Sequence, residues 1–124
     1  MHQSINNLNI IKSQIIEELK KLNNNELPKI IAVSKTFSMD KIEPLLKHGH
    51  THFGENKVQE AILKWSNIKT NNKNFKLHLI GKLQTNKTKQ AVKLFDYIHS
   101  LDSVKLAKEI SKQQKIINKT PKLF

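Results

Sequence analysis

The chain has 124 residues, enough for one small domain with a single modest core. It contains no cysteine, which excludes disulfides and thiolate metal sites, and its apolar stretches are too short to cross a bilayer. Its first residues lack the basic and then apolar layout of a secretory signal, so we expect a cytoplasmic protein.

The formal net charge is +12, and the positive charges are all lysines. A charge of this size raises the question of a nucleic-acid partner. Nucleic-acid readers usually combine arginine with aromatic platforms, whereas this sequence has no arginine and few aromatic residues, at core-like positions. We therefore interpret the lysines as a solvated surface, and keep a basic polyanion-binding module as an alternative.

The N-terminal segment is predicted to be an amphipathic helix, because apolar residues recur there at helical spacing. An Asn-rich loop that contains Pro28 follows, and the apolar residues 30–33 predict the first strand. The residues that define the apolar face of the helix are Ile5, Leu8, Ile11, Ile15, Leu19 and Leu22.

The rest of the chain alternates between predicted helices and strands. Ser38 or Asp40 is expected to cap the first of these helices, in which Pro44 fits only the first turn. Residues 67–74 are expected to form a surface loop, and Ser103 to cap the last helix. Helices are predicted at residues 38–49, 55–66, 85–95 and from Ser103 onward, and strands at residues 51–53, 75–81, 96–100 and 120–124.

This alternation predicts right-handed crossovers and a parallel sheet. Four strand–helix repeats and the start of a fifth strand amount to half of a (β/α)8 barrel. We expect an α/β fold: the first half of a TIM barrel, preceded by the amphipathic helix and truncated at the start of the fifth strand. Residues 1–124 would form a single incomplete domain, whose two open sheet edges an oligomer could cover.

Polar groups follow each predicted strand, where parallel α/β folds bind their ligands. Lys35 comes directly after the first strand. An amine held among apolar walls loses hydration of its ammonium form, and the neutral amine can attack a carbonyl. The alternative is a lysine that extends from the strand end into water.

Other polar residues near the strand ends allow two interpretations each. Asn56 could hold a ligand oxygen or cap its own helix, and Glu55 could be an acid or a favourable charge at a helix start. His78 could point into the barrel, or be an ordinary hydrogen-bonded core residue. The predicted start of a helix contains Gln84, Asn86 and Lys87. These residues could bind an anion there, or they could be ordinary loop and capping residues.

Four stretches, taken in order, carry a family resemblance: "AVSKT" (residues 32–36), "HFGENKVQEA" (52–61), "HLIGKLQTNK" (78–87) and "IHSLDS" (98–103). They resemble the YggS/PROSC family of pyridoxal phosphate homeostasis proteins, in a match that extends over nearly the whole chain from residue 29. The family is similar to the barrel domain of alanine racemase.

The resemblance implies that pyridoxal 5'-phosphate is the cofactor, held as a Schiff base on Lys35. It places Asn56 beside the cofactor, and makes Lys87 a weaker candidate at the cofactor rim. No metal ligand is expected. The predicted cofactor-binding residues are Lys35, Asn56, His78, Gln84 and Asn86.

The family implies a non-catalytic protein that binds and buffers the cofactor in intracellular pyridoxal phosphate homeostasis. Racemisation would need a second base on the far face of the cofactor ring, and the sequence offers no convincing candidate. Family members run to about twice this length, and the missing half carries the groups that bind the cofactor's phosphate, so this chain is expected to bind weakly. The alternative is half of a racemase-like enzyme that a second chain completes.

Overall fold

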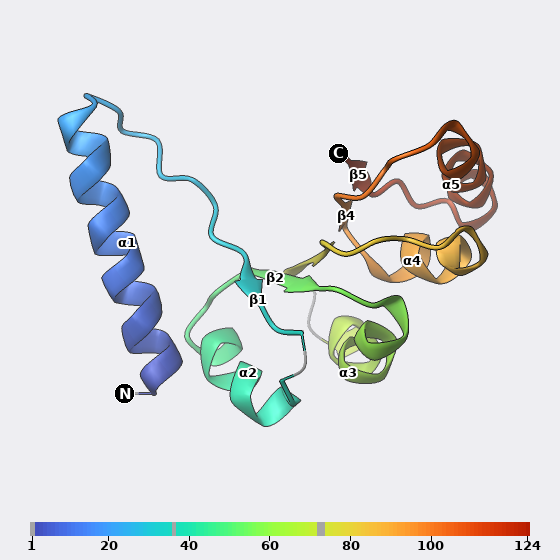
Figure 1. Ribbon diagram of the computed structural model, residues 1–124. Coiled ribbons are helices and arrows are strands. Elements are labelled where there is room, and N and C mark those ends of the chain that lie inside the picture. The colour runs from blue at the N-terminus through green and yellow to red at the C-terminus, as the bar shows by residue number, and fades with distance from the viewer. Residues whose placement is uncertain (1, 36, 72–73) are drawn as a thin grey trace.

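The computed structural model describes residues 2–35, 37–71 and 74–124, in which helices and strands alternate (Figure 1). The elements are α1 (Gln3–Lys21), β1 (Ala32–Val33), α2 (Met39–Lys47), β2 (His52–Glu55), α3 (Val58–Asn71), β3 (Lys76–Leu79), the short 3-10 helix η1 (Thr85–Lys87), α4 (Thr88–Leu94), β4 (Tyr97–Ile98), α5 (Val104–Ile117) and β5 (Lys122–Leu123).

The five strands form one parallel sheet in the order β1-β2-β3-β4-β5. Each strand lies beside its neighbour in sequence, with a helix in each connection, as the alternation predicted. Helices α2 to α5 follow the curve of the sheet along one side (Figure 1). The predicted α/β half-barrel is therefore confirmed, and β1 and β5 are the two edges of the sheet.

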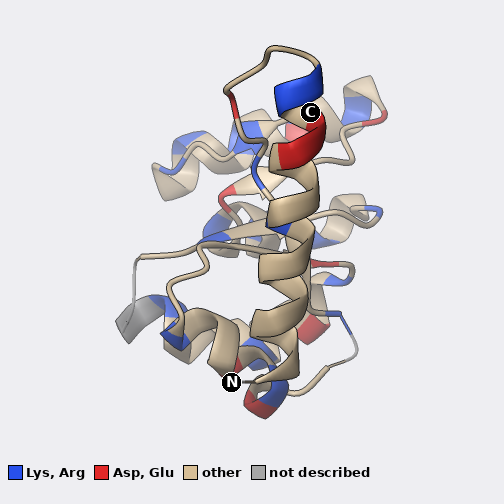
Figure 2. Cartoon of the chain, turned by 90° about the vertical axis from the view of Figure 1, so that its left-hand side faces the viewer, with Lys and Arg blue, Asp and Glu red and all other residues tan. Residues whose placement is uncertain are grey.

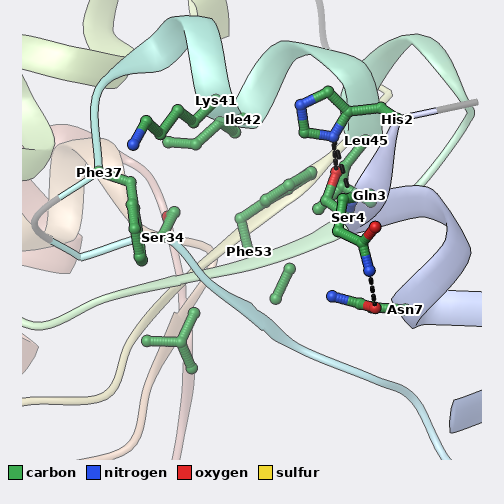
Figure 3. A pocket seen from close by; sticks show the side chains of 12 residues that line it. His2, Gln3, Ser4, Asn7, Ser34, Phe37, Lys41, Ile42, Leu45 and Phe53 are labelled. Carbon is green, nitrogen blue, oxygen red and sulfur yellow. Dashed lines mark hydrogen bonds between the residues drawn. The ribbon is translucent and has the colours of Figure 1, made fainter.

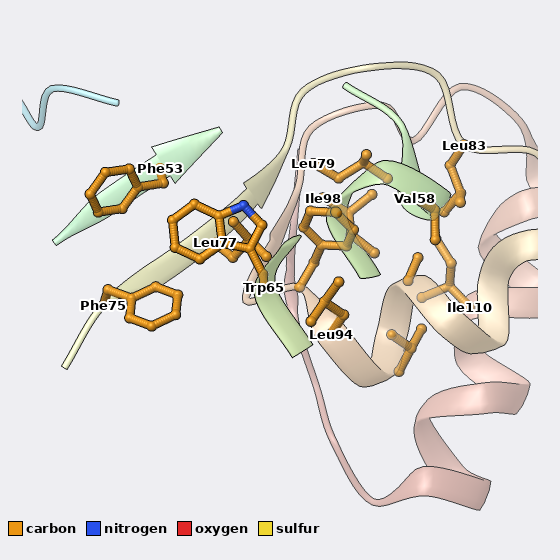
Figure 4. Packing of buried hydrophobic residues seen from close by; sticks show 14 of the residues in the cluster. Phe53, Val58, Trp65, Phe75, Leu77, Leu79, Leu83, Leu94, Ile98 and Ile110 are labelled. Atoms are coloured by element: carbon orange, nitrogen blue, oxygen red, sulfur yellow. The ribbon is translucent and has the colours of Figure 1, made fainter. Parts of the chain in front are cut away.

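The hydrophobic core lies between the sheet and the helices (Figure 4). Phe53 on β2 packs against Trp65 on α3, with ring centroids 5.2 Å apart, and Phe75 packs against both, at 5.0 Å from Trp65 and 6.3 Å from Phe53. Leu77 and Leu79 of β3 point into the same core and are fully buried. Because side chains alternate along a strand, the residues between them face the opposite side of the sheet.

Both predicted ends of α3 and the predicted place of Pro44 are wrong. Helix α3 was expected to begin at residue 55, but β2 extends to Glu55 and the helix begins at Val58. Helix α3 was expected to end at residue 66 and to be followed by a loop, but it continues to Asn71. Ile68 packs against the core one turn after Trp65, so the apolar face extends further than the polar sequence suggests. In α2, Pro44 lies inside the helix rather than in its first turn.

Helix α1 is confirmed as a helix, but only its N-terminal part is buried. Ile5 and Leu8 belong to the core, whereas Ile11 and Leu22 of the predicted apolar face are exposed. The helix stands beside the sheet, with its N-terminal end close to α2 (Figure 1). No helix among the described residues is both long and apolar enough to span a membrane.

Lysines occur in all parts of the fold rather than in one cluster. Blue segments lie on helices and on loops throughout the chain in Figure 2. This distribution agrees with the interpretation of the net charge of +12 as a solvated surface.

The two serines that begin helices differ in their contacts. Ser103 accepts a hydrogen bond from the backbone N–H of Leu106 at 3.1 Å, whereas the side chain of Ser38 makes no capping bond to α2. We expect Ser103→Ala to lower the free energy of unfolding by about 1 kcal/mol, because one helix N–H loses its partner. Ser38→Ala, the matched control, should change it by less than about 0.5 kcal/mol in urea denaturation. Equal losses would show that the cap of α5 contributes nothing specific.

Candidate functional site

Several of the predicted site residues follow the carboxyl ends of neighbouring strands, at the same end of the sheet. Lys35 follows β1, Asn56 follows β2, and Gly81 follows the end of β3. The loops after β2 and β3 touch closely: a Cβ on Gly81 would lie 2.1 Å from the backbone oxygen of Asn56 and 2.6 Å from its Oδ1. Only glycine therefore allows these two strand ends to meet. Thr36, the last residue of the Ser-Lys-Thr motif, lies outside the described residues.

Lys35 is exposed, as in the alternative of a lysine that extends from the strand end into water, and apolar walls do not enclose it. The reason is the position of β1, which is an edge strand. A lysine at the end of an edge strand has neighbouring backbone on one side only. Ser34, directly before it, is buried against β2, so the two adjacent side chains lie in very different environments.

A buried carboxylate fastens the loop that carries Lys35. Glu55 is fully buried behind β2 and forms an ion pair with Lys64 of α3 at 3.0 Å. It also accepts hydrogen bonds from the Ser34 hydroxyl and from Trp65 Nε1, the latter at 3.1 Å. A buried charge is costly unless it is paired and hydrogen-bonded, and here it is both. Glu55 is therefore not a charge at a helix start, as was expected, but the last residue of β2.

Lys64 extends this network to the backbone. Its ammonium donates to the carbonyl oxygens of Ser34 at 2.6 Å and of Phe37 at 2.8 Å. These two carbonyls flank Lys35 in the chain. The Glu55–Lys64 pair thus sets the position of the segment between β1 and α2 and, with it, the start of the Lys35 side chain.

Some of the predicted cofactor-binding residues line a pocket of about 400 Å³ at the strand ends. Asn56 and Gln84 both line it, together with the weaker candidate Lys87. Asn86 is exposed and does not line it, and neither do Lys35 and His78. The full lining of this rim pocket is Asn56, Lys57, Val58, Gln59, Lys82, Gln84 and Lys87.

A second, more apolar pocket of about 470 Å³ lies along the β1 edge, between α1 and α2 (Figure 3). Val33 of β1 and Phe37 of the following loop line it and are each about half exposed. Phe53 and Ile42 form its floor from the core side. This edge pocket adjoins the segment that carries Lys35 but does not include that residue.

His78 lies on the face of the sheet opposite the helices, within a row of rings. It is buried and stacks on Tyr97 with ring centroids 4.2 Å apart and planes 5° from parallel. Its Nε2 lies 2.9 Å from Nδ1 of His52, and its Nδ1 lies 2.9 Å from Nε2 of His99. Burial, reinforced by the neighbouring His52 and His99, lowers the pKa of His78 to about 4. His78 is therefore neutral at pH 7.

The site residues predicted from the sequence did not include the other members of this row, His52, His99 and Tyr97. A signal for them exists in the sequence. Because side chains alternate along a strand, the residues next to a strand's core positions point to the other face. His52 on β2, His78 on β3 and His99 directly after β4 all satisfy that pattern.

We expect Lys64→Met to destabilise the chain strongly, because Glu55 would remain as a buried and unpaired charge. Breaking a buried pair in this way costs about 3 to 5 kcal/mol of unfolding free energy. Lys21→Met is the matched control, since Lys21 pairs with Glu18 on the surface at 3.1 Å. Its effect in urea denaturation should stay below about 1 kcal/mol. Similar losses in the two variants would contradict the role given to the buried pair.

Comparison with known proteins identifies relatives of one kind, although no family model matches the chain. The sequence is 38% identical over 116 residues to the pyridoxal phosphate homeostasis protein of Haemophilus influenzae, which covers 93% of this chain and 48% of that protein. It is 46% identical over 103 residues to the protein of the same name from Buchnera aphidicola of Schizaphis graminum, covering 82% and 44%.

Solved structures agree with this match. PipY of Synechococcus elongatus, in a structure with pyridoxal phosphate bound, is 41% identical, with a TM-score of 0.72 over 88% of this chain and 52% of that one. A protein of unknown function from Bifidobacterium adolescentis has a TM-score of 0.83 at 23% identity, and supports the fold alone. The chain spans about half the length of the curated relatives it matches. Within that span, it belongs to the family of the pyridoxal phosphate homeostasis proteins.

Proposed function

We propose that this chain binds pyridoxal 5'-phosphate covalently through Lys35 and acts in the homeostasis of that cofactor in the cytoplasm. The observation that carries the proposal is the position of the Lys35 amine. It follows the carboxyl end of β1, on a segment whose backbone Lys64 and Glu55 hold in place. The identity of 41% to PipY, which has been solved with this cofactor bound, supports the same assignment.

The residues present fit the covalent part of such a site. The cofactor supplies an aldehyde, which a primary amine captures with loss of water. Lys35 supplies that amine, on an exposed residue after β1. Asn56, set against Gly81, offers an amide at the same edge of the sheet, and Gln84 offers another in the rim pocket. We propose Asn56, His78, Gln84 and Asn86 as the further cofactor-binding residues.

We propose no catalytic role for this chain. Reactions such as racemisation need a base on each face of the cofactor ring. His78 is the residue of the inner face that comes closest to such a role, but both of its ring nitrogens already face other histidines at 2.9 Å. Neither ring nitrogen of His78 is therefore directed at a ligand. The names of the curated relatives, which refer to homeostasis, agree with a binding protein.

The first test is to trap the cofactor on Lys35. We expect wild-type protein, mixed with about one equivalent of pyridoxal phosphate, to absorb in the visible, and borohydride to fix the cofactor to the peptide that contains Lys35. Lys35→Ala should reduce the amount of trapped cofactor at least about tenfold, because the position of Lys35 favours its amine over those of the other lysines. Lys47→Ala is the control, since Lys47 is exposed on α2 and pairs with Glu43 on the surface of the same helix.

The trapped peptides are identified by mass spectrometry, which separates the site from general lysine chemistry. If Lys35→Ala and Lys47→Ala trap equal amounts of cofactor, spread over many peptides, labelling is indiscriminate and the proposed function is wrong.

We also propose that a second copy of the chain covers the open sheet edges. Unpaired strands at the edge of a sheet are templates for pairing with another strand. Val33 on β1 is 48% exposed, and Phe124, directly after β5, is 63% exposed. Each edge of the sheet thus carries an exposed apolar side chain. Burying both would remove this surface from water.

Self-association should therefore depend on the edges and not on exposed apolar residues in general. We expect Val33→Lys and Phe124→Lys each to weaken association at least about tenfold, by light scattering at about 0.15 M salt, where the charge of the chain is screened. Leu63→Lys on α3 is the control, because Leu63 is 80% exposed but lies on a helix. A wild-type chain that stays monomeric at all concentrations would refute this proposal and leave that of the cofactor untouched.

A further inference from the structure

Three histidines cross the inner face of the sheet in a continuous chain of ring contacts. His52 is the first residue of β2, His78 lies within β3, and His99 directly follows β4. The nitrogens that face each other, Nδ1 of His52 with Nε2 of His78 and Nδ1 of His78 with Nε2 of His99, are both 2.9 Å apart. This histidine row thus runs from the amino ends of the strands toward their carboxyl ends, where Lys35 lies.

The chemistry of imidazole allows this row to exist in two arrangements. A neutral imidazole has one N–H and one lone pair, so each contact needs a donor on one side and an acceptor on the other. If His52 donates to His78, then His78 donates through Nδ1 to His99. If His99 donates to His78, then His78 donates through Nε2 to His52. Both arrangements satisfy the same two distances.

We infer that the histidine row is a proton relay between the two ends of the sheet. In the starting state His52 carries the extra proton, His78 holds its proton on Nδ1, and Nε2 of His99 is free. The Nδ1 proton of His52 moves to Nε2 of His78, and the Nδ1 proton of His78 moves to Nε2 of His99. The charge has then passed from His52 to His99, and His78 is neutral again as the other tautomer.

The surroundings of the row keep the charge at its ends. The pKa of His78 is lowered to about 4, mainly because it is buried, so the middle ring is neutral in both resting states. His52 and His99 are each only half-buried, and burial lowers the pKa of each. Other charged and titratable groups act on the row as well. Lys29, Lys76 and His50 disfavour a charge on His52, Asp96 favours it, and Lys122 lies over the Tyr97 ring at 5.8 Å.

This inference rests on the proposed function, in which the relay would carry protons to and from the place where the Schiff base forms. When the Lys35 amine condenses with an aldehyde, the amine loses two protons and the carbonyl oxygen leaves as water with both. Release of the aldehyde reverses this exchange. Protons must therefore move at the strand ends in both directions, although none is gained overall. His99 is the end of the row on that side, and we propose it as a residue that exchanges protons there.

The first experiment needs no cofactor. In the cofactor-free chain with ¹⁵N-labelled histidine, long-range ¹H–¹⁵N correlation spectra report which nitrogen of each ring carries the proton. We expect both nitrogens of His78 to show values between those of the two pure tautomers, from pH 6 to pH 8. In His99→Gln the relay is cut, because an amide donates and accepts but passes no proton, and His78 should settle into one tautomer. His48→Gln, at an exposed histidine outside the row, should leave His78 unchanged.

The second experiment measures how fast borohydride-trappable pyridoxal phosphate forms on Lys35. We expect His99→Gln and His52→Gln to slow this capture at least about tenfold, in line with general acid–base contributions, without changing the final amount. His48→Gln should capture at the wild-type rate.

Either of two results overturns the relay: a single fixed tautomer of His78 in the wild type, or capture by His99→Gln at the rate of His48→Gln. A wild-type chain that captures no cofactor on Lys35 would instead refute the proposed function, and the spectra of the cofactor-free chain would still decide whether the two tautomers exchange.

Discussion

The Glu55 carboxylate, buried behind the sheet, is the constraint on which the arrangement of the site depends. A carboxylate in that position must find an opposite charge, and Lys64 on α3 supplies it at 3.0 Å. The same ammonium then has donors left for the carbonyls of Ser34 and Phe37. One ion pair therefore joins β1, β2 and α3, and it holds backbone atoms before and after Lys35. The core and the site share this pair, so a change that loosens one loosens the other.

Because side chains alternate along each strand, the two faces of the sheet carry different kinds of residue. On β3, Leu77 and Leu79 enter the core, while His78 between them points to the inner face. The core face gains its stability from burial of apolar area, and the inner face is left free to carry polar chemistry. His52 pairs with Lys76 and His78 with Tyr97, so each histidine lies two residues further along its strand than the partner of the previous one. The three histidines, far apart in the sequence, therefore form a diagonal row across neighbouring parallel strands. The fold thus brings isolated histidines together in a polar row on one face, while the apolar residues on the other face still fill the core.

The order of elements could be predicted from local signals, and the contacts that complete the site could not. Apolar runs mark the strands and apolar residues at helical spacing mark the helices, and Ser103 caps α5, since these features act within a few residues. The extension of α3 to Asn71 depends on Ile68 reaching the core, and the exposure of Ile11 depends on where α1 lies relative to the sheet. Both are tertiary effects. The partner of Glu55 and the histidine row likewise arise from residues on different elements, which one sequence pattern does not reveal.

The exposure of Lys35 and the open edge of β1 have the same origin. Val33 lies on β1, which has a neighbouring strand on one side only, and Lys35 follows that strand, so water reaches both. Any chain that pairs with β1 would bury Val33 and at the same time remove water from the surroundings of the lysine. Loss of hydration disfavours an ammonium ion relative to the neutral amine that attacks an aldehyde. Covering the edge and binding the cofactor are then linked, and by thermodynamic reciprocity a bound cofactor must favour the covered edge by the same factor.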